Sequence, residues 1–141
     1  MTYAYQVWGF TYECHKNKLV VQQNKATRLL TNQDLNSESR LKNFKLLSIQ
    51  DLIIFYSNIY IFKCLNGLNC DICRQFFKYR NTRNTRNQNN RPLDLPNCKL
   101  NYTQNSIFFK GVKAWNALDP SIRFCDKLSN FRHRLTNIYL N

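Results

Sequence analysis

The amino-acid sequence predicts a small, mainly α-helical domain with a basic irregular linker and room for one short strand or hairpin. Apolar residues recur at helical spacing in several segments, and one segment carries the start and stop signals of a helix. The chain has 141 residues, of which 43% are hydrophobic and 14% aromatic. A chain of this length and composition can bury a hydrophobic core, so we expect a globular protein.

The first helix is expected from His15 to Thr31. Its apolar residues are Leu19, Val20, Ala26, Leu29 and Leu30, and Gln, Asn and Lys fill the positions between them. This spacing is closer to the helical period than to the alternation of a strand.

The clearest helix is expected from Ile49 to Asn66. Ser48 to Asp51 has the form of a capping box, Leu47 and Leu52 are placed as a hydrophobic staple, and Gly67 provides a left-handed stop. Apolar side chains nearly encircle this segment, so we expect it to be buried on most sides and to form the centre of the core.

The range Phe77 to Asn97 is expected to be a linker. Its apolar pattern gives way to Asn, Arg, Thr and Gln, and Pro92 and Pro96 lie near its end. It has too little apolar surface to offset the entropy of ordering. Lys99 to Thr103, which follows, alternates weakly and is compatible with a short strand.

Two further helical segments are expected in the C-terminal part. One helical face is formed by Ile107, Phe108, Gly111, Val112 and Trp115. Asp119 before Pro120 resembles an N-cap followed by proline at the first helical position. A last helix is expected around Lys127 to Leu140, where an apolar stripe lies opposite two arginines: Leu128, Phe131, Leu135 and Ile138 against Arg132 and Arg134.

The charge of the chain is high and uneven. It has 21 Lys and Arg against 8 Asp and Glu, a net charge of +13. Residues 1–73 hold eight basic and five acidic side chains, whereas residues 74–141 hold thirteen and three. One stretch of eighteen residues has six cations and no acid: Arg74, Lys78, Arg80, Arg83, Arg86 and Arg91. Such a charge density attracts polyanions, and nucleic acid is the first candidate partner and an anionic membrane the second. The alternative is that the stretch is only a solvated loop.

Aromatic residues accompany this basic stretch. Phe76, Phe77 and Tyr79 alternate with the first cations, which would place rings for stacking beside charges for phosphates. The alternative is that Phe76 and Phe77 close a helix onto the core. A second group of candidate cations lies beside the expected Trp115 helix: Lys110, Lys113 and Arg123.

Nothing in the sequence indicates secretion or a membrane span. The segment from Met1 to Phe10 lacks the features of a secretory signal, and the most apolar segment, Leu52 to Phe62, is too short to cross a bilayer. We therefore expect no membrane partner, an intracellular location in the cytoplasm or nucleus, and reduced cysteines.

Metal and catalytic sites are not expected. Cys70 and Cys73 form a CxxC, but no second close pair accompanies it, so zinc completed by Cys64, Cys98, Cys125 or His133 is a weak hypothesis. The acidic residues are scattered singly, and the three glycines form no phosphate-binding loop. We expect neither enzymatic activity nor a cofactor.

Seven short landmarks follow one another along the chain. They are Val7 to Gly9, Gln23 to Leu30, Leu46 to Leu52, Ile61 to Lys63, Thr82 to Asn84, Ser106 to Ile107 and Gly111 to Leu118. In this order and spacing the chain resembles the C-terminal, post-polymerase portion of the reverse transcriptase of LINE-type (non-LTR) retrotransposons of the jockey and CR1-like sort. One departure is that Asp119 separates Leu118 from Pro120, where the family more often has Leu-Pro directly after Trp-Asn-x.

In that family the polymerase palm with its Tyr-x-Asp-Asp centre lies upstream of this region, and this chain has no such motif. The resemblance therefore implies a non-catalytic remnant of an RNA-directed DNA polymerase that binds RNA or DNA through backbone contacts. It implies a thumb-like helical region at 1–76, the basic Asn/Arg-rich linker at 77–97 and a C-terminal helical region at 98–141. Two alternatives remain open at this point: a stand-alone structural or protein-interaction module, and a non-functional relic of a mobile element.

Overall fold

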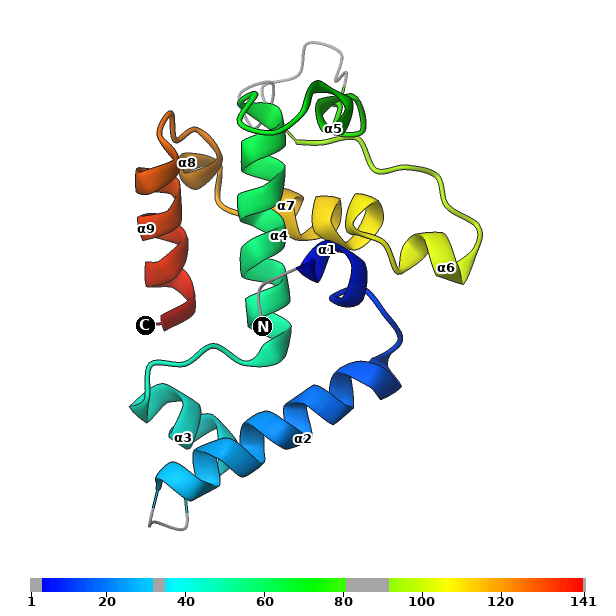
Figure 1. Cartoon of the computed structure of the whole chain (residues 1–141). Helices are drawn as coiled ribbons and strands as arrows, with labels where there is room; N and C mark the ends of the chain where they lie inside the picture. The colour runs from blue at the N-terminus through cyan, green and yellow to red at the C-terminus, as the bar shows by residue number, and fades with distance from the viewer. Residues whose placement is uncertain (1–3, 32–34, 81–91, 141) are drawn as a thin grey trace.

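The computed structural model describes residues 4–31, 35–80 and 92–140, and all regular structure in these ranges is helical (Figure 1). The elements in chain order are α1 (Tyr5–Trp8), α2 (Glu13–Leu30), α3 (Ser37–Asn43), α4 (Ile49–Leu65), α5 (Asp71–Gln75), α6 (Asn101–Gln104), the π-helical turn η2 (Ile107–Gly111), α7 (Val112–Ala117), α8 (Pro120–Arg123) and α9 (Leu128–Leu140). The predicted mainly α-helical class is confirmed. Arg83, Arg86 and Arg91 lie outside the described residues.

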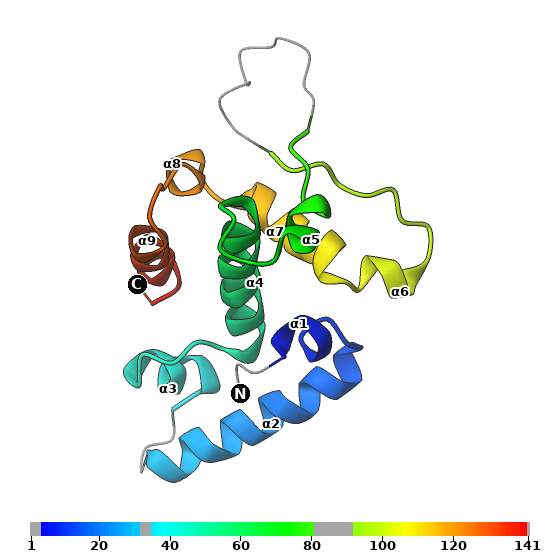
Figure 2. The ribbon, with the colours of Figure 1, turned by 45° about the horizontal axis from the view of Figure 1, so that its top comes forward.

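Helix α4 is the centre of the core, as its sequence predicted. Figures 1 and 2 show α9 along one side of α4, α7 and α5 on another, and α2 crossing below its first turns. Phe62 of α4 stacks on Phe131 of α9 with ring centroids 4.4 Å apart, and Phe131 lies 5.7 Å from the ring of Trp115 in α7. The expected regions 1–76 and 98–141 therefore share one core.

Both ends of α4 follow the predicted signals. Ser48 is the N-cap, and its Oγ accepts a hydrogen bond from the backbone N–H of Asp51 at 3.1 Å. Because aspartate is one methylene shorter than glutamate, the Asp51 carboxylate accepts from the Ser48 hydroxyl, at 2.6 Å, in place of the backbone bond of a full capping box. Gly67 has φ of 69°, the left-handed conformation that ends a helix.

Helix α2 has nearly the predicted bounds, and only part of its predicted apolar set, Leu19 and Val20, packs against the core. Leu29 and Leu30 are exposed, whereas Lys16 and Thr27 are buried. A polar side chain joins α2 to the start of α4: Gln23 Nε2 donates to the carbonyl of Leu47 at 2.8 Å, and Gln23 Oε1 accepts from the N–H of Ile49 at 3.2 Å. Because these polar bonds fix the second half of α2, its apolar periodicity does not indicate that Leu29 and Leu30 stay exposed.

The expected face around Trp115 is mostly correct. Ile107, Val112 and Trp115 are buried, but Phe108 is 37% exposed. The π-helical turn η2 inserts an extra residue per turn, so positions before and after it do not keep the register of one α-helix. Trp115 Nε1 is buried and has no hydrogen-bond partner among the described residues.

The last two helices begin as predicted. Asp119 caps α8, with its carboxylate accepting from the N–H of Ser121 at 2.8 Å, and Pro120 occupies the first turn. In α9, Phe131 and Leu135 are fully buried, as the stripe predicted. Ile138, the last member of the stripe, is half exposed, and the next residue, Tyr139, packs against the core with its ring 6.1 Å from that of Phe55.

The strand expected at Lys99 to Thr103 is wrong, because α6 occupies this region. Local side-chain bonds favour the helical turn: Thr103 Oγ1 donates to the carbonyl of Leu100 at 2.7 Å, and Gln104 Nε2 donates to that of Cys98 at 3.0 Å. No strand occurs in residues 4–31, 35–80 or 92–140 beyond a single antiparallel bridge between Tyr79 and Leu93.

The two ends of the expected linker are part of the fold. Phe77 and Leu93 are buried in the core, although the composition of the range 77–97 predicted too little burial for order. Asn116 of α7 holds Leu93 by both backbone groups: its Oδ1 accepts from the N–H at 2.8 Å, and its Nδ2 donates to the carbonyl at 2.9 Å. A few anchoring residues thus order the ends of a polar segment.

In the part of the chain that the structure describes, no helix combines the length and the apolar character that crossing a membrane requires.

Candidate nucleic-acid interface

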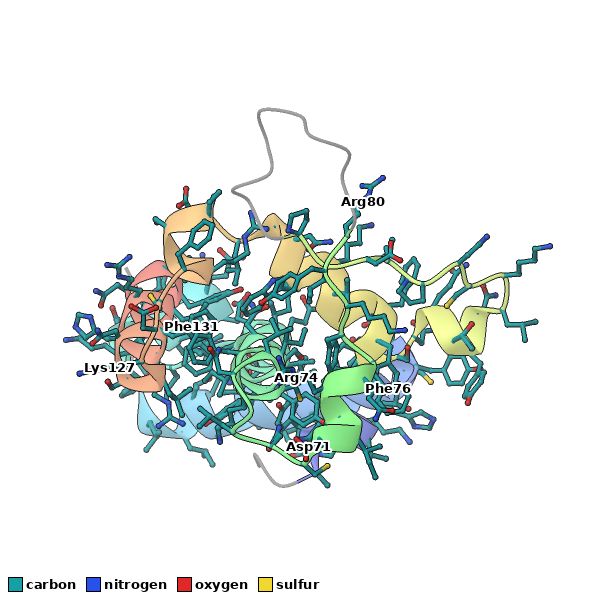
Figure 3. All side chains as sticks on the ribbon, turned by 90° about the horizontal axis from the view of Figure 1, so that it is seen from above. Asp71, Arg74, Phe76, Arg80, Lys127 and Phe131 are labelled. Carbon is teal, nitrogen blue, oxygen red and sulfur yellow. The ribbon has the colours of Figure 1, made fainter. Side chains whose placement is uncertain are left out.

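The chain after α5 places its cations outward. Phe77 is buried, whereas Phe76, Lys78 and Arg80 are exposed. The extended backbone is held against the other end of the basic stretch by two hydrogen bonds, from the N–H of Arg80 to the carbonyl of Pro92 at 2.9 Å and from the N–H of Asp94 to that of Lys78 at 2.8 Å. Alternate residues of extended backbone share a face, so Lys78 and Arg80 lie on one side. Figure 3 shows Arg80 projecting away from the body of the protein.

The sequence left two alternatives for Phe76 and Phe77, exposure for stacking and packing onto the core. Phe76 is exposed and Phe77 is packed onto the core. Phe77 closes α5 onto the core, where its ring lies edge-on to Tyr60 at 6.3 Å. Phe76 is 58% exposed, and its ring lies 4.9 Å from that of Phe108. Phe76 and Phe108 therefore form a pair of partly exposed rings, and the ring of Phe77 lies 5.8 Å from that of Phe108.

A groove continues from this ring pair towards the start of α2. It has a volume of about 410 Å³, and four of its lining residues are aromatic: Phe10, Tyr12, Tyr102 and Phe108. The other lining residues are the apolar Val7 and Ile107 and five polar residues: Gln6, Thr11, Thr103, Asn105 and Ser106. Tyr102 is 75% exposed, and Tyr12 is also exposed. Exposed rings beside amide and hydroxyl groups can stack on bases and exchange hydrogen bonds with them.

The ion pairs among the described residues do not involve the cations of α5 or of the extended backbone directly after it. Both ion pairs in the described ranges are formed by Glu13. Its Oε1 lies 2.5 Å from Lys16 Nζ and 4.0 Å from Lys110 Nζ. Arg74, Lys78 and Arg80 are exposed and have no ion pair among the described residues. Figure 3 shows Arg74 and Phe76 on opposite sides of α5, so Arg74 is not beside the ring pair.

The second group of predicted cations lies elsewhere. Lys110 and Lys113 line a different pocket of about 500 Å³, together with Glu13 and Lys16. Arg123 is only 9% exposed, and burial lowers the pKa of its guanidinium. Its Nε and Nη1 atoms have no hydrogen-bond partner in the described part of the chain. The structure therefore places Lys78 and Arg80 together but not with Lys110, Lys113 or Arg123.

The sequence analysis missed Tyr12 and Tyr102. Both lie in short segments with no apolar periodicity, so no pattern placed them on a helix face. The neighbours of Tyr102 offered a signal: a single ring between Asn101 and Thr103, in a polar stretch, has few apolar residues with which to be buried.

No three His, Cys, Asp or Glu side chains within the described ranges come together as a metal site. Comparison of the chain with family models, curated proteins and solved structures gives no match.

Proposed function

We propose that the protein is a non-catalytic module that binds RNA or DNA through its phosphate backbone, with exposed rings stacking on unpaired bases. One observation carries the proposal: Lys78 and Arg80 are exposed without an ion pair among the described residues, and they follow Phe76, whose ring packs on Phe108 at the edge of the aromatic groove. The net charge of +13 provides the attraction.

The two parts of the interface contribute differently. Lys and Arg displace counterions condensed on the phosphates, which gives affinity that falls with salt and does not depend on sequence. Each stacked base adds about 1–3 kcal/mol, because every base has a face that can stack on an aromatic ring. The stacking contribution favours a nucleic acid with accessible bases over a regular duplex, whereas the phosphate contribution is somewhat larger on a duplex.

We further propose that the chain is a remnant of the C-terminal region of a LINE-type reverse transcriptase. This proposal rests on the order and spacing of the sequence landmarks. Two of them, Ile61 to Lys63 and Gly111 to Leu118, contribute residues to the core: Ile61 and Phe62 from the first, Val112 and Trp115 from the second. Sequencing of the genomic flank tests the origin. A reading frame upstream that encodes a Tyr-x-Asp-Asp centre supports it, and an upstream frame of an unrelated fold contradicts it.

A protein-interaction module is the second candidate. It is favoured by three large apolar side chains that α2 leaves in contact with solvent, because a partner that covered them would remove apolar surface from water. These residues are Val21, Leu29 and Leu30.

The salt dependence of binding tests the proposed function. A single-stranded oligoribonucleotide and the matching oligodeoxyribonucleotide are titrated with the full chain at several salt concentrations. The test variant replaces four arginines with glutamine: Arg80, Arg83, Arg86 and Arg91. We expect the slope of log affinity against log salt to flatten by roughly two to four units, with affinity lost about equally on all sequences and thermal stability nearly unchanged.

A variant with the same change in net charge serves as the control. It replaces four exposed cations of α2 and the α3 region, at the opposite end of the molecule (Figure 1): Lys25, Arg28, Lys42 and Lys45. The control should keep the wild-type slope. Equal flattening in both variants would show that total charge alone sets binding, and a wild-type chain without salt-dependent binding would contradict the proposed function.

A further inference from the structure

Two thiols lie in contact at the start of α5. Cys70 Sγ and Cys73 Sγ are 3.1 Å apart, and both cysteines are free. The backbone N–H of Cys73 donates to the carbonyl of Cys70 at 3.0 Å, which closes a tight turn. Such a turn keeps its first and fourth Cα atoms within about 7 Å, close to the separation that a disulfide requires.

The two thiols differ in their surroundings. Cys70 is exposed, and Cys73 is half-buried against the core. Tyr60, from α4, donates its hydroxyl hydrogen to Cys73 Sγ at 3.3 Å. The Tyr60 hydroxyl therefore occupies a lone pair of Cys73, and the S–H of Cys73 is free to donate to Cys70.

This arrangement favours the thiolate of Cys70. The hydrogen bond from the Cys73 thiol, followed by that from the Cys73 backbone N–H, lowers the pKa of Cys70 below its ordinary value. Cys64 provides the contrast, because burial raises the pKa of its thiol. Since the thiolate is the reactive form, an exposed cysteine with a lowered pKa reacts first with disulfides.

We propose that Cys70 and Cys73 form a reversible thiol–disulfide pair, with Cys70 as the attacking thiolate, Cys73 as the resolving thiol and small-molecule disulfides as the oxidant. The Cys70 thiolate attacks one sulfur of the small disulfide, forms a mixed disulfide and releases the first small thiolate. The Cys73 thiol then loses its proton to solvent, attacks Cys70 Sγ and releases the second. Two protein thiols are oxidised, and one small disulfide is reduced to two thiols.

Mass spectrometry of the full chain equilibrated with glutathione and glutathione disulfide tests the proposal. The background variant replaces Cys14, Cys98 and Cys125 with serine, so that Cys64, Cys70 and Cys73 remain. We expect loss of two hydrogen atoms, and peptide mapping should place the bond between Cys70 and Cys73. In the same background, Cys73→Ser should stop at the mixed disulfide on Cys70, and Cys70→Ser should form no internal bond.

The rate of alkylation of Cys70 by iodoacetamide provides a second readout, because it follows the thiolate fraction. Cys73→Ala removes the donating thiol, so its pH profile for Cys70 should shift to higher pH. Thermal melting of each variant checks that it is folded. An unshifted profile, or a bond between other cysteines in the glutathione buffer, would overturn the proposal. Neither experiment includes nucleic acid, so the result is independent of the proposed binding function.

Discussion

The side-chain amide of Asn116 pairs with both backbone polar groups of Leu93, as a neighbouring strand would. Because Leu93 is buried, its N–H and carbonyl would lose these partners if the amide were removed. We predict that Asn116→Ala lowers the free energy of unfolding by about 1–3 kcal/mol. Urea denaturation measures this, and Asn137→Ala, at an exposed position of α9, is the control that should remain near wild type.

Trp115 should be among the most costly side chains to remove. It is 2% exposed and lies against Phe131, so Trp115→Ala is predicted to cost about 3–5 kcal/mol. Trp115→Phe should cost less, because the buried indole N–H has no partner to lose. Both values follow from chemical denaturation, and a cost below about 1 kcal/mol for the alanine variant would contradict the burial of this side chain.

Phe76 and Phe77 should separate binding from folding. Phe76→Ala is predicted to weaken single-strand binding by about 1–3 kcal/mol with little change in stability, because the ring is exposed. Phe77→Ala should mainly destabilise the fold, because its ring is buried. Binding titrations and thermal melts of both variants check this, and unchanged binding by Phe76→Ala would exclude that ring from the interface.

The chain should show no DNA synthesis. We predict no nucleotide incorporation on a primed RNA template with magnesium, because its acids are scattered singly along the sequence and phosphoryl transfer uses paired carboxylates to hold metal ions. Extension assays with the purified chain measure this, with a known reverse transcriptase as the positive control. Template-dependent incorporation by the chain alone would overturn the expectation.

The ends of the helices could be predicted where local sequence signals determine them. A capping residue begins or ends a helix within a few positions of itself, so the local sequence suffices to predict the ends of α4 and the start of α8. The residues that do so are Ser48, Gly67 and Asp119. The exposed side of α2 and the π-helical turn η2 were not predictable in this way. They depend on which distant segment each contacts, as the bonds from Gln23 to the start of α4 show.

The candidate site was predicted in part for the same reason. Charge density identified the stretch with Lys78 and Arg80, because charge does not depend on contacts. It also suggested Arg123, which the fold buries, and it gave no indication of Tyr12 or Tyr102. The groove brings these rings together from segments about ninety residues apart, which no local pattern in the sequence records.

The position of Trp115 also gives the protein an internal optical probe. An indole enclosed by apolar groups emits at shorter wavelength than one in water, because no solvent dipoles relax around its excited state. The other tryptophan, Trp8, is only partly buried, so aqueous quenchers should reach it more easily. Since Trp115 lies against Phe131 of α9, the emission that resists quenching should report whether α9 is docked, in the native chain and without a label.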